Sequence, residues 1–287
     1  MCDEITEAEN TAFFLNRREF AGLGASAAAL ATVPGCVTAA EAPTSSRMVT
    51  IDTPDGKADA FFVYPTRGKH PAVIMWPDIA GLRDAYKTMG ARLAAAGYAV
   101  LVVNQYYRTS PAPILDSLMA WRSDAGQKKL KPMIAAITPS GTTSDAAAFV
   151  SWLDMQKEVN AKKRIGSAGY CMGGPFTVRT AFANPARVGA AASFHGGGLV
   201  GPEADSPVNL IGKTRAAYLF AIAKNDDERA PKEKTQLRAA ADAASRPAEI
   251  EVYPAQHGWC TLDAPIYDRT QAERAWGRML DLFKANL

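Results

Sequence analysis

The stretch Ile165–Pro175 reads IGSAGYCMGGP, and the interpretation of the whole chain starts from it. A run suited to a strand precedes its G-x-C-x-G-G centre, and a helix-competent run, Phe176–Ala183, follows. This is the nucleophile-elbow pattern G-x-S-x-G with cysteine in the place of serine. Gly169 and Gly173 remove side chains that would crowd a sharp strand-to-helix turn, so Cys171 can occupy a strained conformation with its sulfur exposed. The alternative is a glycine-rich turn around a small buried cysteine.

Two later stretches supply the partners that such a cysteine needs. The apolar run 218–223 is followed by Asp226 and Asp227, and the alternating run 249–254 is followed by His257. Nucleophile, acid and histidine in this order, each at the C-terminal end of a strand, is the order of the α/β-hydrolase triad. Because the thiolate is the reactive form, we predict that His257 takes the proton of Cys171 and that Asp226 orients His257. Asp227 is the alternative acid.

These residues resemble the dienelactone hydrolase family, the carboxymethylenebutenolidase type of α/β hydrolase, which uses cysteine as nucleophile. The matching pieces lie within about Met48–Leu287; they are Gly169–Gly174, the Asp226 turn, His257–Trp259, and Trp76–Gly81 after an early strand. The resemblance implies the α/β-hydrolase fold, a mostly parallel sheet with helices on both faces. It also implies hydrolysis of small esters or lactones through a thioester acyl-enzyme, without a cofactor.

The same resemblance implies roles for residues around the cysteine. The backbone N–H groups of Met172 and Ile79 would form the oxyanion hole. Asp78 stands where the family has an acidic residue that interacts with the resting thiol, although the best-known members have the longer Glu. Arg108 matches one of two arginines that hold a substrate carboxylate. The second is expected shortly after His257, but residues 258–261 contain no arginine. The substrate-binding residues expected in all are Arg108, Tyr107, His195 and Trp259.

Composition excludes several other classes of function. The chain has 287 residues and a net charge of +3, with both signs interspersed and no basic tract, so nucleic acid is not an implied partner. No run of eighteen apolar residues occurs after the N-terminal region, which argues against a membrane span. The four cysteines do not suggest a disulfide framework, and the three histidines show no metal-ligand spacing, so no metal site is expected. The oligomeric state stays open, and a monomer is compatible with the sequence.

The first 40 residues are expected to be an export leader rather than part of the fold. Asn16–Phe20 carries a twin-arginine pattern, the Ala/Gly-rich run Ala21–Val33 follows, and small residues offer processing sites at Val37–Ala40. Twin arginine before an apolar run indicates Tat export, and the expected destination is the periplasm. An amphipathic or disordered arm is one alternative, and a lipid anchor on Cys36 is a minority one.

The remaining chain, residues 47–287, is expected to be one α/β-hydrolase domain. Alternating strands and helices indicate a mostly parallel sheet covered on both faces. An Asp-Gly hairpin begins it, and the least regular part, residues 104–141, is expected to form a rim with one or two short helices. The expected strands are 48–51, 58–64, 72–76, 98–103 and 188–194, and the expected helices are 84–96, 143–159, 231–244 and 272–283. The alternative in function is an exported protein that binds a ligand on this fold without catalysis.

If the leader is processed, the mature protein begins between about Cys36 and Glu41, because cleavage of an export signal falls after its small residues. N-terminal sequencing of the protein from its native host measures this directly. Recovery of a soluble cytoplasmic chain that starts at Met1 would contradict the prediction.

Overall fold

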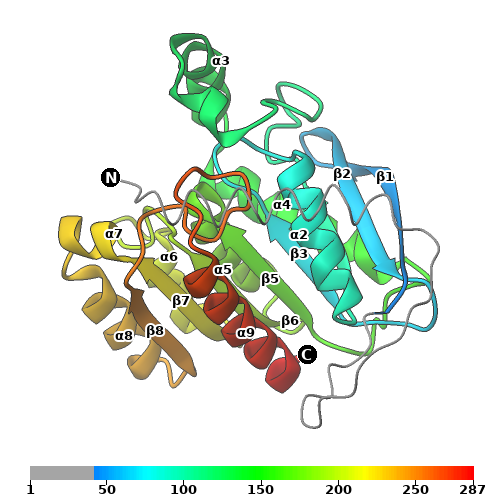
Figure 1. Ribbon diagram of the computed structural model, residues 1–287. Coiled ribbons are helices and arrows are strands. Elements are labelled where there is room, and N and C mark those ends of the chain that lie inside the picture. Colours follow the sequence, from blue (N-terminus) through cyan, green and yellow to red (C-terminus); the bar gives the residue numbers. More distant parts are fainter. Residues whose placement is uncertain (1–41) are drawn as a thin grey trace, which may run out of the picture.

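The computed structural model describes residues 42–287, and the predicted leader lies outside them (Figure 1). These residues form an eight-stranded sheet of order β1-β2-β4-β3-β5-β6-β7-β8. β1 and β2 form the hairpin predicted around Asp55-Gly56, β2 pairs antiparallel with β4, and the remaining pairs are parallel. The strands are β1 (Thr44–Thr53), β2 (Gly56–Pro65), β3 (Ala72–Trp76), β4 (Ala99–Val103), β5 (Ile165–Tyr170), β6 (Val188–Phe194), β7 (Ala217–Ala223) and β8 (Ala248–Tyr253).

Helices cover both faces of this sheet, as predicted. In one layer, α2 and α9 pack Tyr86 and Phe283 onto the central strands; both helices lie in front of the sheet in Figure 1. In the other, α4, α5 and α8 bury Phe149, Val178 and Leu237 against the opposite face. The helices are α2 (Asp84–Ala95), α3 (Asp124–Ala135), α4 (Pro139–Asp154), α5 (Gly174–Ala183), α6 (Pro207–Leu210), α7 (Lys224–Arg229), α8 (Glu233–Ala243) and α9 (Arg269–Asn286), with short 3₁₀ turns at Leu118–Arg122, Cys171–Gly173 and Ile211–Lys213.

The start of α4 corrects the sequence prediction. The helix begins at Pro139, four residues before the predicted position, because the Thr138 side chain accepts the backbone N–H of Gly141 and proline suits a first helical turn. Ser144 and Asp145, near the expected start, lie inside the helix, and Asp145 is buried.

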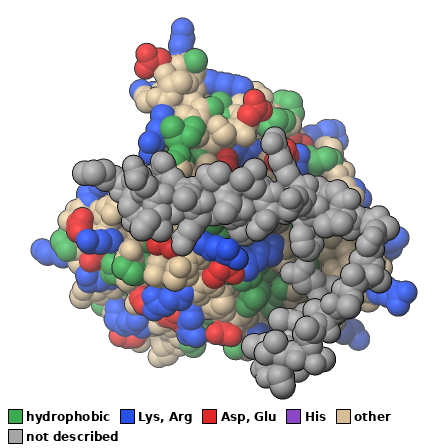
Figure 2. All heavy atoms as spheres, viewed as in Figure 1, with side chains coloured by type: hydrophobic (Ala, Val, Ile, Leu, Met, Phe, Trp, Pro, Cys, Tyr) green, Lys and Arg blue, Asp and Glu red, His purple; other side chains and the backbone are tan. Residues whose placement is uncertain are grey.

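The irregular region after β4 forms the expected rim. The 3₁₀ turn Leu118–Arg122 and α3 project beyond the rest of the structure at the top of Figure 1. They pack on the body through a small apolar cluster of Tyr106, Ile114, Leu130 and Met133. No helix among residues 42–287 is both long and apolar enough to cross a membrane. On the face seen in Figure 2, cationic and anionic side chains are intermingled rather than gathered by sign.

Candidate active site

The predicted elbow is present between β5 and α5. Cys171 follows the last residue of β5 and has a φ of 53°, a left-handed conformation that non-glycine residues rarely adopt. A Cβ on Gly169 would lie 2.1 Å from the carbonyl oxygen of Gly173, and a Cβ on Gly173 would lie 2.4 Å from that of Trp76. Both glycines are therefore required by close backbone contacts. The second contact shows that the elbow lies directly against the end of β3.

The structure brings the three residues of the predicted triad into one hydrogen-bonded chain. His257 Nε2 lies 3.1 Å from Cys171 Sγ, and His257 Nδ1 lies 2.6 Å from Asp226 Oδ2. The backbone N–H of His257 donates to Asn225 Oδ1 at 2.8 Å, which fixes the loop that carries the ring. Asp227 instead accepts Lys234 Nζ at 2.6 Å. Of the two candidate acids, Asp226 is the one that contacts the histidine.

Electrostatics at His257 favour the protonated ring. Burial alone would lower the pKa of His257, but its hydrogen bonds to Asp226 and Cys171 and the charges of those two groups raise the pKa to about 10. The raised pKa means that these contacts favour the protonated imidazole. A positive charge on a ring 3.1 Å from sulfur would favour the thiolate, the nucleophilic form of cysteine.

The backbone N–H groups of Ile79 and Met172 are the two donors expected for an oxyanion hole. The N–H groups of Asp78 and Ala80 are bonded to the Tyr86 hydroxyl and to the Asp78 carboxylate, whereas that of Ile79 has no hydrogen-bond partner among residues 42–287. Met172 is the second residue of a 3₁₀ turn, where N–H groups lack acceptors within the turn.

Tyr106 connects the two segments that carry these N–H groups. Its hydroxyl donates to the carbonyl of Ile79 at 2.7 Å and lies 3.8 Å from the sulfur of Met172. The neighbouring Gln105 side chain donates to the carbonyl of Asp78 at 2.7 Å. Side chains from one loop thus hold the Ile79 turn beside the elbow.

Asp78 is placed differently from the expectation that it controls the thiol. Its two carboxylate oxygens accept Arg83 Nη1 at 2.7 Å and Arg83 Nη2 at 2.9 Å, and both side chains are buried. Arg83 also holds Asp263 through Nε and Nη2, each at 2.7 Å. This bidentate pairing raises the pKa of Arg83 although burial opposes it. Asp78 is therefore half of a buried ion pair that anchors its own turn.

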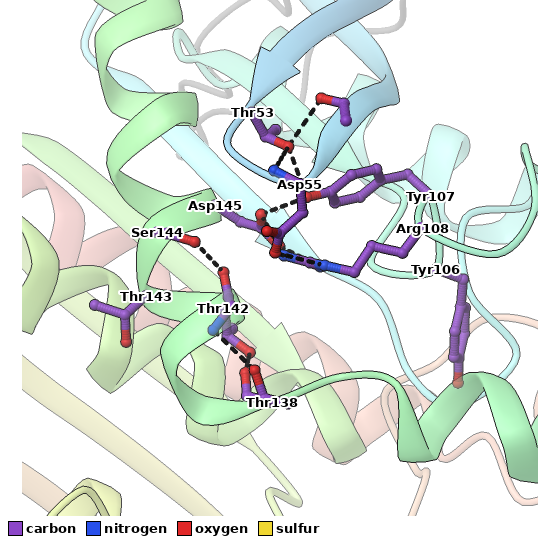
Figure 3. Close-up of polar contacts among 12 residues, drawn as sticks. Thr53, Asp55, Tyr106, Tyr107, Arg108, Thr138, Thr142, Thr143, Ser144 and Asp145 are labelled. Atoms are coloured by element: carbon purple, nitrogen blue, oxygen red, sulfur yellow. Dashed lines mark hydrogen bonds and ion pairs between the residues drawn. The ribbon is translucent and has the colours of Figure 1, made fainter.

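Arg108 and Tyr107, which were expected to bind substrate, contact carboxylates of the protein. Arg108 donates two hydrogen bonds of 2.8 Å to Asp145 and one of 2.9 Å from Nε to Asp55, and Tyr107 donates to Asp145 at 2.7 Å (Figure 3). The close-up shows Arg108 between these two carboxylates, with Tyr106 pointing away from them. Through these two ion pairs, Arg108 joins the β1–β2 turn to α4.

His195 and Trp259 lie behind the site rather than on its surface. Trp259, expected to contact substrate, is fully buried and stacks on Tyr253. His195 is 1% exposed, and its ring lies edge-to-face with that of His257 at 4.7 Å between centroids. His195 follows the end of β6, and the loop after β8 brings His257 to it from the other side of β7.

Sequence reasoning missed the residues that hold the site in place. Arg83, Gln105, Tyr106 and Asn225 each make at least one of the contacts described above. Asn225 adjoins Asp226, and Tyr106 lies in the same run as Arg108, so their positions alone offered a signal. Nothing in the sequence pairs Arg83 with Asp263, because 180 residues separate them.

Comparison with known proteins identifies the family. The model of the dienelactone hydrolase family matches residues 58–287. This chain belongs to the dienelactone hydrolase family. Over 224 residues it is 29% identical to an Escherichia coli (strain K12) protein named "Putative carboxymethylenebutenolidase", covering 76% of this chain and 78% of that one. The expected resemblance is confirmed.

Solved structures agree on the fold. A Klebsiella pneumoniae structure titled "Putative Dienelactone Hydrolase" superposes with a TM-score of 0.72 at 23% identity, covering 84% of this chain and 99% of the other. A structure titled as a dienelactone hydrolase-like promiscuous phosphotriesterase from metagenomic libraries has a TM-score of 0.68 at 20% identity, with coverage of 84% and 98%. With the sheet order above, they establish the predicted α/β-hydrolase fold, and this dienelactone hydrolase family member is a hydrolase.

Gly169→Ala is expected to destabilise the protein by at least about 3 kcal/mol, since the new Cβ would overlap backbone atoms that cannot move independently. Gly277→Ala on α9 is the matched control, because a Cβ there meets nothing within 4 Å. That change should be neutral or stabilise by about 1 kcal/mol, as alanine favours helix. Chemical unfolding of both variants compares the two free energies. Equal stabilities would contradict the close contact at the elbow.

Arg108→Ala should destabilise by about 3 kcal/mol, because Asp145 would stay buried without its partner. It should change kcat/KM for an anionic and a neutral ester by the same factor. Arg67→Ala is the control: Arg67 is exposed, its side chain meets no carboxylate in the described part of the chain, and its loss should cost under about 0.5 kcal/mol. A selective loss of activity on the anionic ester would return Arg108 to the substrate site.

Proposed function

We propose that this family member hydrolyses small carboxylic esters or lactones through a thioester acyl-enzyme. Cys171 is the nucleophile, His257 the general acid and base, and Asp226 the residue that orients His257. The hydrogen-bonded chain from Asp226 through His257 to Cys171 supports this proposal above all, because each distance matches what proton transfer requires.

The proposed reaction starts from a Cys171 thiolate beside a protonated His257. Sulfur attacks the carbonyl carbon, and the negative charge that develops on the carbonyl oxygen is held by the N–H groups of Ile79 and Met172. As the C–O bond breaks, His257 gives its proton to the leaving alkoxide. His257 then takes a proton from water, the resulting hydroxide attacks the thioester, and Cys171 leaves as thiolate while the proton stays on His257.

Neutral substrates fit the site better than anionic ones. Arg108, the one arginine of the expected clamp, is bound to Asp55 and Asp145, and Arg83 beside the Ile79 turn is bound to Asp78 and Asp263. Ile79 and Met172 pack against the apolar rim cluster, so the acyl group would meet hydrocarbon beside the oxyanion hole. We infer that the acyl portion of the substrate is apolar and uncharged.

Cys171→Ala should reduce hydrolysis of p-nitrophenyl acetate by at least about a thousandfold with the fold intact, because removal of a nucleophile costs several orders of magnitude. Cys171→Ser should also be poor, since a hydroxyl is a far weaker acid than a thiol. Cys260→Ala is the matched control, a buried thiol with no contact to His257, and should keep its activity.

Iodoacetamide provides the chemical counterpart of these variants. It should abolish turnover in the wild type and in Cys260→Ala at the same rate, since both retain the Cys171 thiol. Residual activity above about 1% in Cys171→Ala would contradict covalent catalysis. An absence of turnover in the wild type, on a panel of neutral esters and lactones, would favour a protein that only binds ligand.

A further inference from the structure

His195 is a buried histidine that the proposed reaction does not use. It is 1% exposed, and neither Nδ1 nor Nε2 has a hydrogen-bond partner among the described residues. A buried polar group without a partner costs stability, so it usually has another role. The backbone of His195 is fixed, with a φ of 40° and an N–H that donates to Ala221 at 2.8 Å.

The ring of His195 completes a cluster of potential metal ligands. One ring nitrogen of His195, one of His257 and the sulfur of Cys171 lie within 4.8 Å of one another. Sequence spacing had given no reason to expect a metal site, but the ends of β5 and β6 and the loop after β8 bring these three residues together. A thiolate with two imidazoles is a ligand set that suits zinc and other thiophilic ions rather than magnesium or calcium.

The surroundings are also those of a zinc site. His257 donates from Nδ1 to Asp226, an arrangement that leaves Nε2 for a metal and orients the ring. Tetrahedral zinc with bonds of about 2.0 Å to nitrogen and 2.3 Å to sulfur needs its ligand atoms about 3.3–3.7 Å apart. His257 Nε2 and Cys171 Sγ are already 3.1 Å apart, so only the approach of these two residues to His195 has to tighten.

We propose that Zn²⁺ binds to Cys171, His195 and His257 and thereby switches off hydrolysis. The inhibitory part rests on the proposed function; the binding itself does not. Sulfur and both imidazoles each donate a lone pair to the ion, and the one proton shared by Cys171 and His257 leaves to solvent. Cys171 and His257 are then both bound to the metal, so the sulfur cannot attack a carbonyl and the imidazole cannot transfer a proton.

The first experiment titrates Zn²⁺ into the purified full chain against a chromophoric chelator. We expect one equivalent that depends on Cys171, release of one proton at neutral pH, parallel loss of p-nitrophenyl acetate turnover, and recovery with EDTA. Co²⁺ serves as a spectroscopic probe, because a thiolate ligand gives charge-transfer absorption in the near ultraviolet. That band should be present in the wild type and absent in Cys171→Ser. Because Cys2 and Cys36 are present in both proteins, the comparison also removes the signal of any ion bound to them.

Variants separate the proposed ligand from other histidines. His195→Phe and His195→Gln should weaken Zn²⁺ binding at least about tenfold, since loss of a second-shell partner already costs that much. His70→Gln is the matched control. The ring nitrogens of His70 contact the carbonyls of Gly97 and Arg67, and His70 is not part of the Cys171, His195 and His257 cluster. Its loss should leave Zn²⁺ binding unchanged. If neither His195 variant folds, the Co²⁺ spectra of the wild type and Cys171→Ser decide.

Several results would overturn the proposal. An active wild type that binds no Zn²⁺ removes the metal site and leaves the hydrolase assignment intact. Zn²⁺ binding that is equal in Cys171→Ser, or equal in a folded His195 variant, also removes it. Turnover that rises with Zn²⁺ would replace inhibition by metal-assisted hydrolysis. A wild type that binds Zn²⁺ through Cys171 but has no esterase activity would overturn the proposed function alone.

Discussion

The contact between the elbow and the end of β3 determines the geometry of the whole site. Gly173 lies against the carbonyl of Trp76 at a distance that no side chain would permit, and β3 and β5 are hydrogen-bonded neighbours in the sheet. The sheet register therefore sets how far the Ile79 turn is from the N–H of Met172. Catalytic groups on separate loops reach a fixed geometry because the backbone beneath them is in contact.

A second constraint acts through the buried guanidinium of Arg83. It joins the Asp78 turn to Asp263 in the loop that follows His257, and Asp263 also accepts the backbone N–H of Leu118 at 3.1 Å. Three loops around the site thus share one carboxylate–arginine network. Removal of one member would leave a buried charge without a partner, which costs more than the loss of an exposed ion pair.

The positions of Cys171, Asp226 and His257 were predictable because they lie in local sequence patterns. The contacts that hold these residues in place were not predictable. Glycine spacing around Cys171 and the strand ends before Asp226 and His257 each carry their own signal. The partners of Asp78 and Arg108 were not predicted. Asp145 reaches Arg108 only when α4 packs beside the β1–β2 turn, whereas Arg83 lies close to Asp78 in sequence and no pattern marks the two as a pair. The close approach of His195 to His257 likewise depends on strand order rather than spacing.

The rim formed by residues 118–135 has its own small apolar cluster, set apart from the three larger clusters that surround the sheet. Substitutions at distant, independent sites add with little coupling, so changes in the rim leave the energetics of the sheet largely untouched. Yet Ile79 and Met172, on the turn after β3 and at the elbow, pack against the same cluster. A change of side-chain volume in residues 118–135 would therefore be transmitted to these two turns while the sheet beneath them stays as it is.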